Sequence, residues 1–353
     1  MNSKDSMILK DIQTAFHKRF SSGITTIDSH TAGEYTRLVV HGTGRIPGNS
    51  MAEKRQYFID NLDRQRLLLT REPRGNRDVV AAVITEPVTP GASFGLIYMD
   101  ACRYPYLCGH ATIGAVTTLV ETGIISATAD ETGFAEIIVD TPSGPMSTLA
   151  GIEQKRVISV SFTSVPCFVF AEDILMDIPS AGQICIDLVC AGGFFAMVDL
   201  DQPCFKNKRP NNRQLIDLGM SITHKACRDL KVCHPQRLEV SSIDVTEFYS
   251  HGQPGKGESI VIYGESHMDR SPCGTGTAAK MALLRHKKLI DVQTVYVNKG
   301  PLDTQFKAEI IRETMVGEYP AVLVKITGNA HITGLHHFVL DKFDPFPDGF
   351  LLS

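Results

Sequence analysis

The hydrophobic pattern of the chain is dominated by short apolar runs of the kind that form β-strands. Each run is rich in β-branched or aromatic residues and is bounded by Gly, Pro, Asn or Asp, as strands separated by turns are. The runs span residues 24–27, 38–40, 96–99, 136–139, 157–162, 194–198, 260–263, 295–297 and 321–326. They predict strands along the whole length of the chain.

Helical spacing occurs at three places between these runs. Apolar side chains recur at positions 8, 12, 16 and 20 and predict an amphipathic helix over residues 7–20, which we interpret as an N-terminal extension packed on the body of the protein. Ser50 and Glu53 have capping-box spacing and predict a helix to about Arg66. A weaker helical period covers residues 211–226. Strands mixed with such helices indicate an α+β protein.

Length and charge narrow the classes of function. The 353 residues exceed twice the commonest domain length of roughly 150, so we expect two domains or two fused halves. A formal net charge of −4 without a long basic run argues against nucleic acid or an anionic membrane surface as the main partner. No stretch resembles a membrane span, and the first residues are charged where a secretory signal is apolar. We therefore expect a cytoplasmic protein.

Two of the nine cysteines open a repeated motif. No Cys-x-x-Cys pair is present, so neither a disulfide framework nor a zinc knuckle fits the cysteine pattern. The pattern C-G-x-x-T begins at Cys108 and again at Cys273, close to half a chain length later. A helix-forming stretch follows each copy, over residues 113–121 and 278–289. The two halves therefore look like related units, each with one cysteine at a helix start.

A helix N-terminus gives these cysteines a distinct chemistry. Its unpaired amides and positive dipole end stabilise anions, so a thiolate is favoured there. The amides of two pairs of residues, Gly109–His110 and Gly274–Thr275, could also bind a substrate carboxylate. If the halves face each other, two sulfurs flank one small anionic molecule, which suits removal of a proton from one face of a carbon and its return to the other.

Other interpretations of these residues stay open on sequence grounds. A Cys-Gly step is most often an ordinary buried thiol, and the carboxylate-binding amides alone would serve a non-catalytic amino-acid binding protein. A cysteine hydrolase would need a distant histidine, because residues two apart are poor partners in a helix, so His110 is expected to border the substrate. Asp269 can meet a substrate ammonium, but its position favours a salt bridge with Arg270 or a helix cap.

These motifs resemble the proline racemase and hydroxyproline epimerase family, which has the diaminopimelate epimerase fold and uses no cofactor. The resemblance runs from Thr26 to the C-terminus and rests on residues 28–34, 72–75, 108–110, 192–193 and 269–277. It implies two pseudo-symmetric lobes, each a curved, mostly antiparallel sheet around a central helix, with the active site in the cleft between them. The implied lobes are residues 22–165 and 166–329, with 330–353 returning to the first lobe and 1–21 as the extension.

The resemblance also implies residue roles. Cys108 and Cys273 become the two acid/base groups, and Gly109, His110, Gly274 and Thr275 hold the carboxylate. Asp269, together with His110, meets the ring nitrogen, which replaces the salt bridge favoured above. No cofactor or metal is expected, and a homodimer is a possible assembly.

The implied activity is the interconversion of L- and D-proline, with 4-hydroxyproline 2-epimerase as the alternative. A trans-3-hydroxyproline dehydratase is less favoured, because those enzymes typically carry Thr where this chain has Cys273. A cysteine hydrolase is also less favoured. Leu107 and Ala111 depart from the Met and Gly that the family more often has, which bears on pocket shape rather than on chemistry. The segment 325–328 and residues 336–338 look closer to the proline branch.

Overall fold

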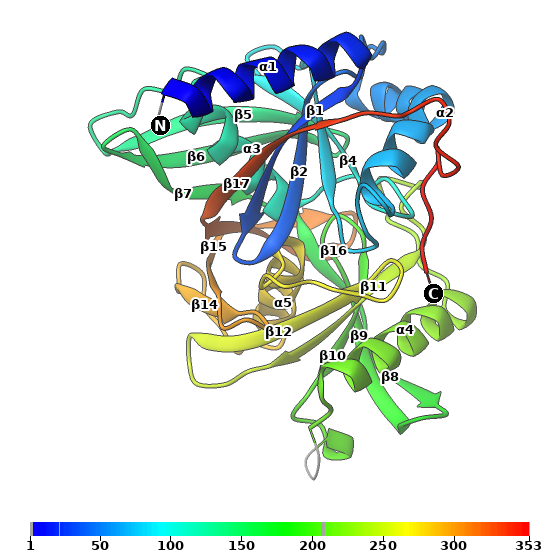
Figure 1. Cartoon of the computed structure of the whole chain (residues 1–353). Helices are drawn as coiled ribbons and strands as arrows, with labels where there is room; N and C mark the ends of the chain where they lie inside the picture. The colour runs from blue at the N-terminus through cyan, green and yellow to red at the C-terminus, as the bar shows by residue number, and fades with distance from the viewer. Residues whose placement is uncertain (1–2, 21, 206–208, 353) are drawn as a thin grey trace.

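The computed structural model describes residues 3–20, 22–205 and 209–352 (Figure 1). Its helices are α1 (Ser3–Arg19), α2 (Met51–Thr70), α3 (Gly109–Glu121), α4 (Asn212–Asp229) and α5 (Gly274–His286), with a short 3₁₀ turn η1 (Pro203–Phe205). The strands of the N-terminal half are β1 (Ile24–Thr31), β2 (Glu34–His41), β3 (Ala81–Thr85), β4 (Phe94–Met99), β5 (Phe134–Thr141), β6 (Gly144–Glu153) and β7 (Arg156–Thr163). Those of the remainder are β8 (Cys167–Ile178), β9 (Gly182–Cys190), β10 (Phe194–Asp199), β11 (Ile243–Ser250), β12 (Lys256–Tyr263), β13 (His267–Met268), β14 (Tyr296–Lys299), β15 (Gln305–Val316), β16 (Tyr319–Gly328) and β17 (Ala330–Phe338).

The predicted elements are found, with small differences at their ends. Every predicted run lies in a strand except for Val295, which precedes β14. The Ser50 side chain caps α2 by accepting from the Glu53 amide, but the Glu53 carboxylate turns to the Asn49 amide, so the reciprocal half of the capping box is missing. The full box occurs instead at α4, between Asn211 and Gln214.

Strand pairing makes two curved sheets that share one strand. Strands β8, β9, β10, β11, β12, β14, β15 and β16 pair in that order, and β16 pairs back to β8, which closes a barrel. Strands β17, β1, β2, β3, β4, β5, β6 and β7 pair in series, and β7 pairs with the end of β16, which leads directly into β17. We call these the α5 sheet and the α3 sheet after the helix that each surrounds.

The order of pairing is the same in both sheets. Nearly all pairs are antiparallel, but β2–β3 and β4–β5 are parallel, and so are β10–β11 and β12–β14. Each parallel pair is bridged by a helix: α2 and α3 in the α3 sheet, α4 and α5 in the α5 sheet. Both C-G-x-x-T motifs therefore stand at the same point of a duplicated strand–helix–strand unit.

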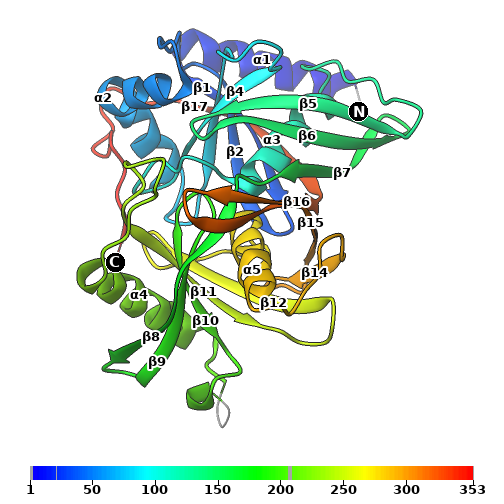
Figure 2. The same ribbon diagram turned by 180° about the vertical axis from the view of Figure 1, so that it is seen from behind.

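Helices α3 and α5 consist mostly of apolar or small residues on all sides, as is typical of a buried helix, with His110 and Lys280 as buried polar exceptions. Residues 109–119 of α3 are all buried, and so are all but one of residues 274–284 of α5. In Figures 1 and 2 α3 lies above α5 in the middle of the molecule, while α1 lies along the top edge. The helix starts, and with them the two motifs, are thereby brought together in the interior.

Candidate active site

The N-termini of α3 and α5 meet at two glycines. A Cβ added to Gly109 would lie 3.3 Å from the Cα of Gly274 and 2.6 Å from Cζ of Phe162. A Cβ added to Gly274 would lie 3.3 Å from the Cα of Gly109 and 2.9 Å from the same ring atom. Real side chains do not tolerate such contacts without displacement. Glycine at both positions therefore allows the two helix starts to touch.

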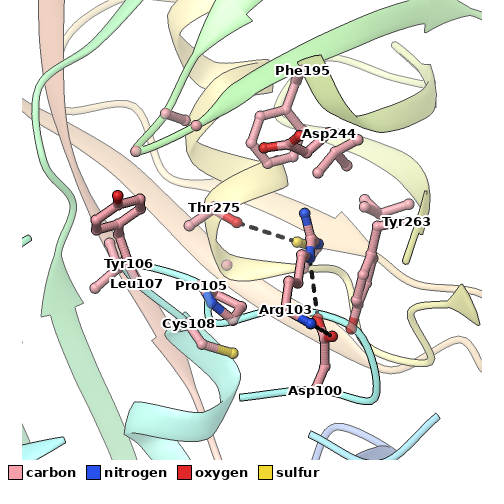
Figure 3. A pocket seen from close by; sticks show the side chains of 18 of the residues that line it. Asp100, Arg103, Pro105, Tyr106, Leu107, Cys108, Phe195, Asp244, Tyr263 and Thr275 are labelled. Carbon is pink, nitrogen blue, oxygen red and sulfur yellow. Dashed lines mark hydrogen bonds and ion pairs between the residues drawn. The ribbon is translucent and has the colours of Figure 1, made fainter. Parts of the chain in front are cut away.

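A cavity of about 340 Å³ opens beside this contact. Its wall includes all seven residues singled out from the sequence: Cys108, Gly109, His110, Asp269, Cys273, Gly274 and Thr275. Further wall residues come from strands of the α5 sheet, among them Phe195, Asp244 and Tyr263, and from the loop after β4, which carries Arg103 (Figure 3). The two motifs thus share one cavity.

Cys108 is the N-cap of α3 and lies close to His110. Its backbone is extended, with φ −143° and ψ 106°, so it stands outside the helix. Its Sγ is 3.4 Å from Nδ1 of His110. The expectation that residues two apart would be poor partners is therefore wrong here, because it assumed that both residues were helical. Burial lowers the pKa of His110, which favours a neutral imidazole.

Cys273 is the N-cap of α5 and has an unusual backbone. Its φ is +57°, in the region that residues with a side chain rarely adopt. Its Sγ accepts a hydrogen bond from the Gly276 amide at 3.3 Å and lies 3.5 Å from Oγ1 of Thr275. The amide of Cys273 donates to Oγ of Ser271. Such strain is held only where the surroundings define it closely, and it is frequent at functional sites.

The side chains around the cavity do not favour either thiolate. Burial, followed by the negative charge of Asp269, raises the pKa of Cys273. Burial also raises the pKa of Cys108, with Asp269 again contributing, although a backbone hydrogen bond acts in the opposite direction. The expected stabilisation of the thiolates by the helix N-termini is therefore outweighed by desolvation and by a neighbouring carboxylate.

Asp269 is buried and is not paired with Arg270. Its Oδ1 accepts from the amide and the hydroxyl of Ser271, both at 2.8 Å, while Oδ2 has no hydrogen bond within the described chain. Burial and the charge of Glu34 raise the pKa of Asp269 to about 6. The salt bridge favoured on sequence grounds is wrong, because Arg270 turns away and pairs with Asp78 at 2.5 Å.

Arg270 belongs to a charged network that the motifs did not reveal. The His267 ring lies 2.9 Å from Oε1 of Glu34 and 3.1 Å from Oδ1 of Asp78. Burial lowers the pKa of His267, but its hydrogen bonds to the two carboxylates outweigh burial and raise it to about 9. Glu34 also accepts from the Arg270 amide. This network fixes the strand end from which Asp269 projects.

A second polar network lies on the side of α5 away from the cavity. The Nζ of fully buried Lys280 donates to the carbonyls of Ser250 and Glu258 and to Oδ1 of Asn298. The amide group of Asn298 donates to Oγ1 of Thr277 and to the carbonyl of Pro272, the residue before Cys273. These hydrogen bonds fix the backbone at Pro272, directly before Cys273.

A cluster of metal ligands and a membrane-spanning helix are both absent from the described residues, 3–20, 22–205 and 209–352. No cluster of His, Cys, Asp and Glu there has the composition of a metal site. In residues 3–20, 22–205 and 209–352, no helix has the length and hydropathy needed to cross a membrane.

Comparison with known proteins identifies relatives over nearly the whole chain. A proline racemase from Clostridioides difficile is 39% identical over 337 residues, which are 95% of this chain and 100% of the relative. A 4-hydroxyproline 2-epimerase from Streptosporangium roseum is 34% identical over 92% of this chain and 97% of the relative.

A solved structure has the same fold. It is a hydroxyproline epimerase from Agrobacterium vitis with bound trans-4-hydroxy-L-proline, and it superposes with a TM-score of 0.87 at 26% identity, over 95% of this chain and 96% of that chain. The model of the family described as proline racemase matches residues 26–351. The resemblance drawn from the motifs is confirmed: the chain belongs to the proline racemase family, whose members include isomerases that racemise or epimerise amino acids.

Proposed function

We propose that the protein interconverts L- and D-proline by proton transfer between two cysteines. The observation that carries the proposal is the meeting of Cys108 and Cys273, each at the N-terminus of a central helix, in the wall of one cavity. One sulfur, as thiolate, takes the α-proton, and the C–H electron pair moves into the carboxylate to give a planar carbanion. The other sulfur, as thiol, gives its proton to the opposite face. The two cysteines end with exchanged protonation states.

The backbone amides at the start of α3 and α5 would bind the substrate carboxylate. The first amides of a helix have no acceptor within the helix, and those of Gly109, His110, Gly274 and Thr275 lie at the cavity. Because α3 and α5 touch, both positive dipole ends act on one point. Negative charge grows on the carboxylate as the proton leaves, so this arrangement stabilises the carbanion more than the bound substrate.

Asp269 would bind the cationic ring nitrogen, with His110 beside it. This contact has a second effect, because the charge of Asp269 raises the pKa of both thiols in the free protein. A substrate cation next to Asp269 offsets that charge and moves both thiol pKa values down. Binding of a cationic imino acid would therefore itself promote formation of the thiolate.

Two lobes are part of the same proposal. Duplication of the pairing order supports a first lobe of residues 22–165 and a second of 166–329, with residues 330–353 belonging to the first. The strand β17 pairs with β1 along its length, and Asp344 of the segment after it pairs with Arg74. The cavity would then lie in the cleft between the lobes.

The decisive experiment is proton exchange at the α-carbon. L-Proline in deuterated buffer should acquire deuterium and lose optical purity, whereas hydrolysis or simple binding requires neither. Cys108→Ser and Cys273→Ser should each lower the rate by roughly 10²- to 10⁴-fold, because a serine hydroxyl is a poor base at neutral pH. Cys227→Ser, at an exposed cysteine, is the matched control. Near-normal turnover by either folded cavity variant would exclude a mechanism with two thiols.

4-Hydroxyproline 2-epimerase is the second candidate. The same thiols would act on either substrate, and the structural neighbour from Agrobacterium vitis holds trans-4-hydroxy-L-proline. Chiral analysis of L-proline and of trans-4- and trans-3-hydroxy-L-proline, each incubated with the protein, separates the candidates. A dehydratase would be recognised because it consumes the 3-hydroxy substrate without forming an epimer.

A further inference from the structure

Charged side chains from the two sheets meet beside the cavity, next to the proposed position of the substrate nitrogen. Glu34 opens β2 of the α3 sheet, and Asp78 lies shortly before β3 of the same sheet. His267 lies in β13, which pairs with β12 of the α5 sheet, and Asp269 and Arg270 follow it. Glu34, His267 and Asp269 are each at most 2% exposed. We call these five residues the charge cluster, and its ion pairs connect the two sheets.

The His267 ring lies between two carboxylates. Its Nε2 is 2.9 Å from Oε1 of Glu34, and its Nδ1 is 3.1 Å from Oδ1 of Asp78. Nη1 of Arg270 is 3.4 Å from both ring nitrogens and so is in line with neither, and the Tyr263 ring packs against the imidazole. A neutral imidazole would turn one lone pair toward a carboxylate, whereas an imidazolium donates from both nitrogens. The two contacts therefore favour a positively charged His267.

The buried part of the charge cluster is one positive charge short. Asp78 and Arg270 are partly exposed and pair with each other at 2.5 Å. The buried residues are two carboxylates, Glu34 and Asp269, and the imidazolium of His267. In the proposed function the cationic nitrogen of the imino acid meets Asp269 and supplies the missing charge. That pairing requires Asp269 to be ionised before the substrate arrives.

Two histidines favour the ionised form of Asp269. Burial, followed by the charge of Glu34, raises the pKa of Asp269 to about 6, while His110, Ser271 and His267 act in the opposite direction. Burial lowers the pKa of His110 itself, so near pH 7 the remaining cation is His267. Loss of the His267 charge would therefore raise the pKa of Asp269 further.

The other titratable side chains near Asp269 provide no positive charge within the part of the chain that the structure describes. They are Cys108, Cys273, Tyr263 and Glu247. Burial raises the pKa of the two thiols and of the phenol, which keeps all three neutral near pH 7. Burial also raises the pKa of Glu247 to about 7, and this group is the same in every variant compared below.

We propose that His267 is a positioning residue of the reaction: held between Glu34 and Asp78 of the other sheet, it supplies the positive charge that keeps Asp269 ionised for the substrate nitrogen. This inference rests on the proposed function and deepens it, because recognition of the nitrogen then depends on the contact between the two sheets. His267 acts only through Asp269, since it lies behind the cavity wall rather than in it.

The first experiment follows the acid limb of kcat/KM for α-proton exchange, with L-proline or trans-4-hydroxy-L-proline, whichever exchanges faster. This limb reports the ionisation of the free protein. His267→Gln removes a positive charge, so the limb should move to higher pH by roughly 0.5–1 pH unit. Glu34→Gln removes a negative charge from the same contact and should move the limb to lower pH. General damage to the fold does not produce opposite shifts.

The second experiment separates the substrate nitrogen from the substrate carboxylate. Pyrrole-2-carboxylate has a carboxylate but no cationic nitrogen, so its binding does not require an ionised Asp269. At pH 6.5, His267→Gln should raise KM for the imino acid by about threefold or more and should leave Kd for pyrrole-2-carboxylate within about twofold. A merely structural loss would weaken the binding of both molecules.

The controls test charge and location. His267→Lys returns a positive charge to the place between the two carboxylates and should restore the acid limb. His286→Gln removes a partly exposed histidine that pairs with Glu172 at 3.2 Å, and it should leave the limb unchanged.

One measurement needs no variant and so stands even if His267→Gln does not fold. Hydrogen bonds to the two carboxylates outweigh burial and raise the pKa of His267 to about 9. At pH 8, where an ordinary histidine is neutral, ¹⁵N NMR of histidine-labelled protein should therefore show a ring with both nitrogens protonated.

The possible outcomes are distinct. An acid limb that stays in place in folded His267→Gln, equal weakening of the imino acid and of pyrrole-2-carboxylate, or the lack of an imidazolium at pH 8 would overturn the role of His267 while the two-thiol function stands. Absence of α-proton exchange in the unmodified protein would remove the proposed function, and this inference with it. Opposite shifts of the limb, with selective loss of imino-acid binding, support the proposal.

Discussion

Asp269 is the residue through which the electrostatics of the cavity are coupled. Its charge adds to burial in raising the pKa of both thiols, and burial, followed by the charge of Glu34, raises the pKa of Asp269 itself to about 6. Only one of its oxygens is held within the described chain, by Ser271. In the proposed function the free oxygen and the unfavourable burial would together favour binding of a cation at Asp269, because a bound cation relieves the cost of keeping the carboxylate charged.

Asp269→Asn should therefore weaken substrate binding and change the pH profile. A charge-assisted hydrogen bond is worth about 1.5–3 kcal/mol, so kcat/KM for the substrate should fall roughly tenfold to a hundredfold. In the unmodified protein the carboxyl gains its proton as pH falls through about 6, and kcat/KM should decline on that acid side. The Asn variant should lack this decline. An unchanged kcat/KM, or an identical acid limb in the folded variant, would show that Asp269 does not bind the substrate nitrogen.

A site residue could be predicted from the sequence where its neighbours along the chain determine its position. The two C-G-x-x-T motifs carry their own geometry, since a cysteine before a helix start brings the following amides with it, and all seven residues singled out lie at one cavity. The predicted salt bridge between Asp269 and its neighbour Arg270 was wrong, because Arg270 pairs with Asp78 instead. The network of His267 with Glu34 and Asp78 joins three distant strand ends, and no local pattern predicts such a meeting.

At the scale of elements, the contact between α3 and α5 depends on the absence of two side chains. A helix start that carries a Cβ at position 109 or 274 would press on Phe162 and on the opposite backbone. The amides that would hold the carboxylate are on these same residues. The spacing of the helices and the binding of the substrate therefore depend on one contact.

Gly109→Ala should lower the free energy of unfolding by about 1–3 kcal/mol, as overpacking of a core does, and should lower turnover as the helix starts move apart. Both effects should be partly relieved by Phe162→Leu in the same chain, because the ring atom 2.6 Å from the new Cβ is removed. Urea unfolding with a double-mutant cycle measures the relief. Gly193→Ala, with no atom near the added Cβ, is the stability control. Strictly additive effects of the two substitutions would show that Phe162 is not the obstacle.

Buried Lys280 supports the second C-G-x-x-T motif through Asn298, which is hydrogen-bonded to Thr277 and to the Pro272 carbonyl. It is fully buried, and its charge lies within reach of Glu247, which is also buried. Lys280→Met would remove three hydrogen bonds and the positive charge beside Glu247, and we expect a loss of about 3–5 kcal/mol of stability.

The loss in Lys280→Met should depend on pH in a defined direction. Burial raises the pKa of Glu247 to about 7, so the folded state binds more protons than the unfolded one between pH 4.5 and 7, and stability falls as pH rises through that window. Without Lys280 the pKa of Glu247 rises further, and the fall should extend to higher pH. Urea unfolding at pH 6 and pH 7.5 measures it, below the pKa of about 8 to which burial lowers Lys280 itself, and Glu247→Gln added to Lys280→Met should remove the pH dependence. A deficit that is the same at both pH values would show that the charge of Glu247 is not involved.

At the scale of single strands, those with a continuous apolar run were predicted, whereas β3, β6, β8, β9, β11, β13, β15 and β17 were not. Runs such as 96–99 and 194–198 are buried on both sides and form β4 and β10. Strands β15 and β17 were missed, because their outward positions are polar and no continuous apolar run results. In a strand with only one buried face, apolar and polar residues alternate, and this alternation is hard to recognise over a few residues.

At the scale of the whole molecule, the two sheets are joined through one strand. β16 pairs with β8 at one end and with β7 at the other, and then continues into β17 of the α3 sheet. The repeat of C-G-x-x-T predicted related halves. The shared strand was not predictable, because pairing between β16 and two strands from different halves leaves no local signal in the sequence. This strand joins the two halves by hydrogen bonds to both.

A planar carboxylate should therefore engage both halves at once. Pyrrole-2-carboxylate mimics the planar carbanion, so we expect it to bind more tightly than proline. It should also shield both thiols, because its carboxylate would accept hydrogen bonds from the amides at the start of both helices. Alkylation of Cys108 and Cys273 is followed by peptide mass mapping over long incubations at alkaline pH, because the raised pKa of both thiols slows their reaction, with exposed Cys204, Cys227 and Cys233 as internal references. Joint protection of the two cavity cysteines, with the references alkylated as before, is the expected result. Protection of one alone at saturating ligand would mean that the two motifs do not enclose a common substrate, however close their helices lie.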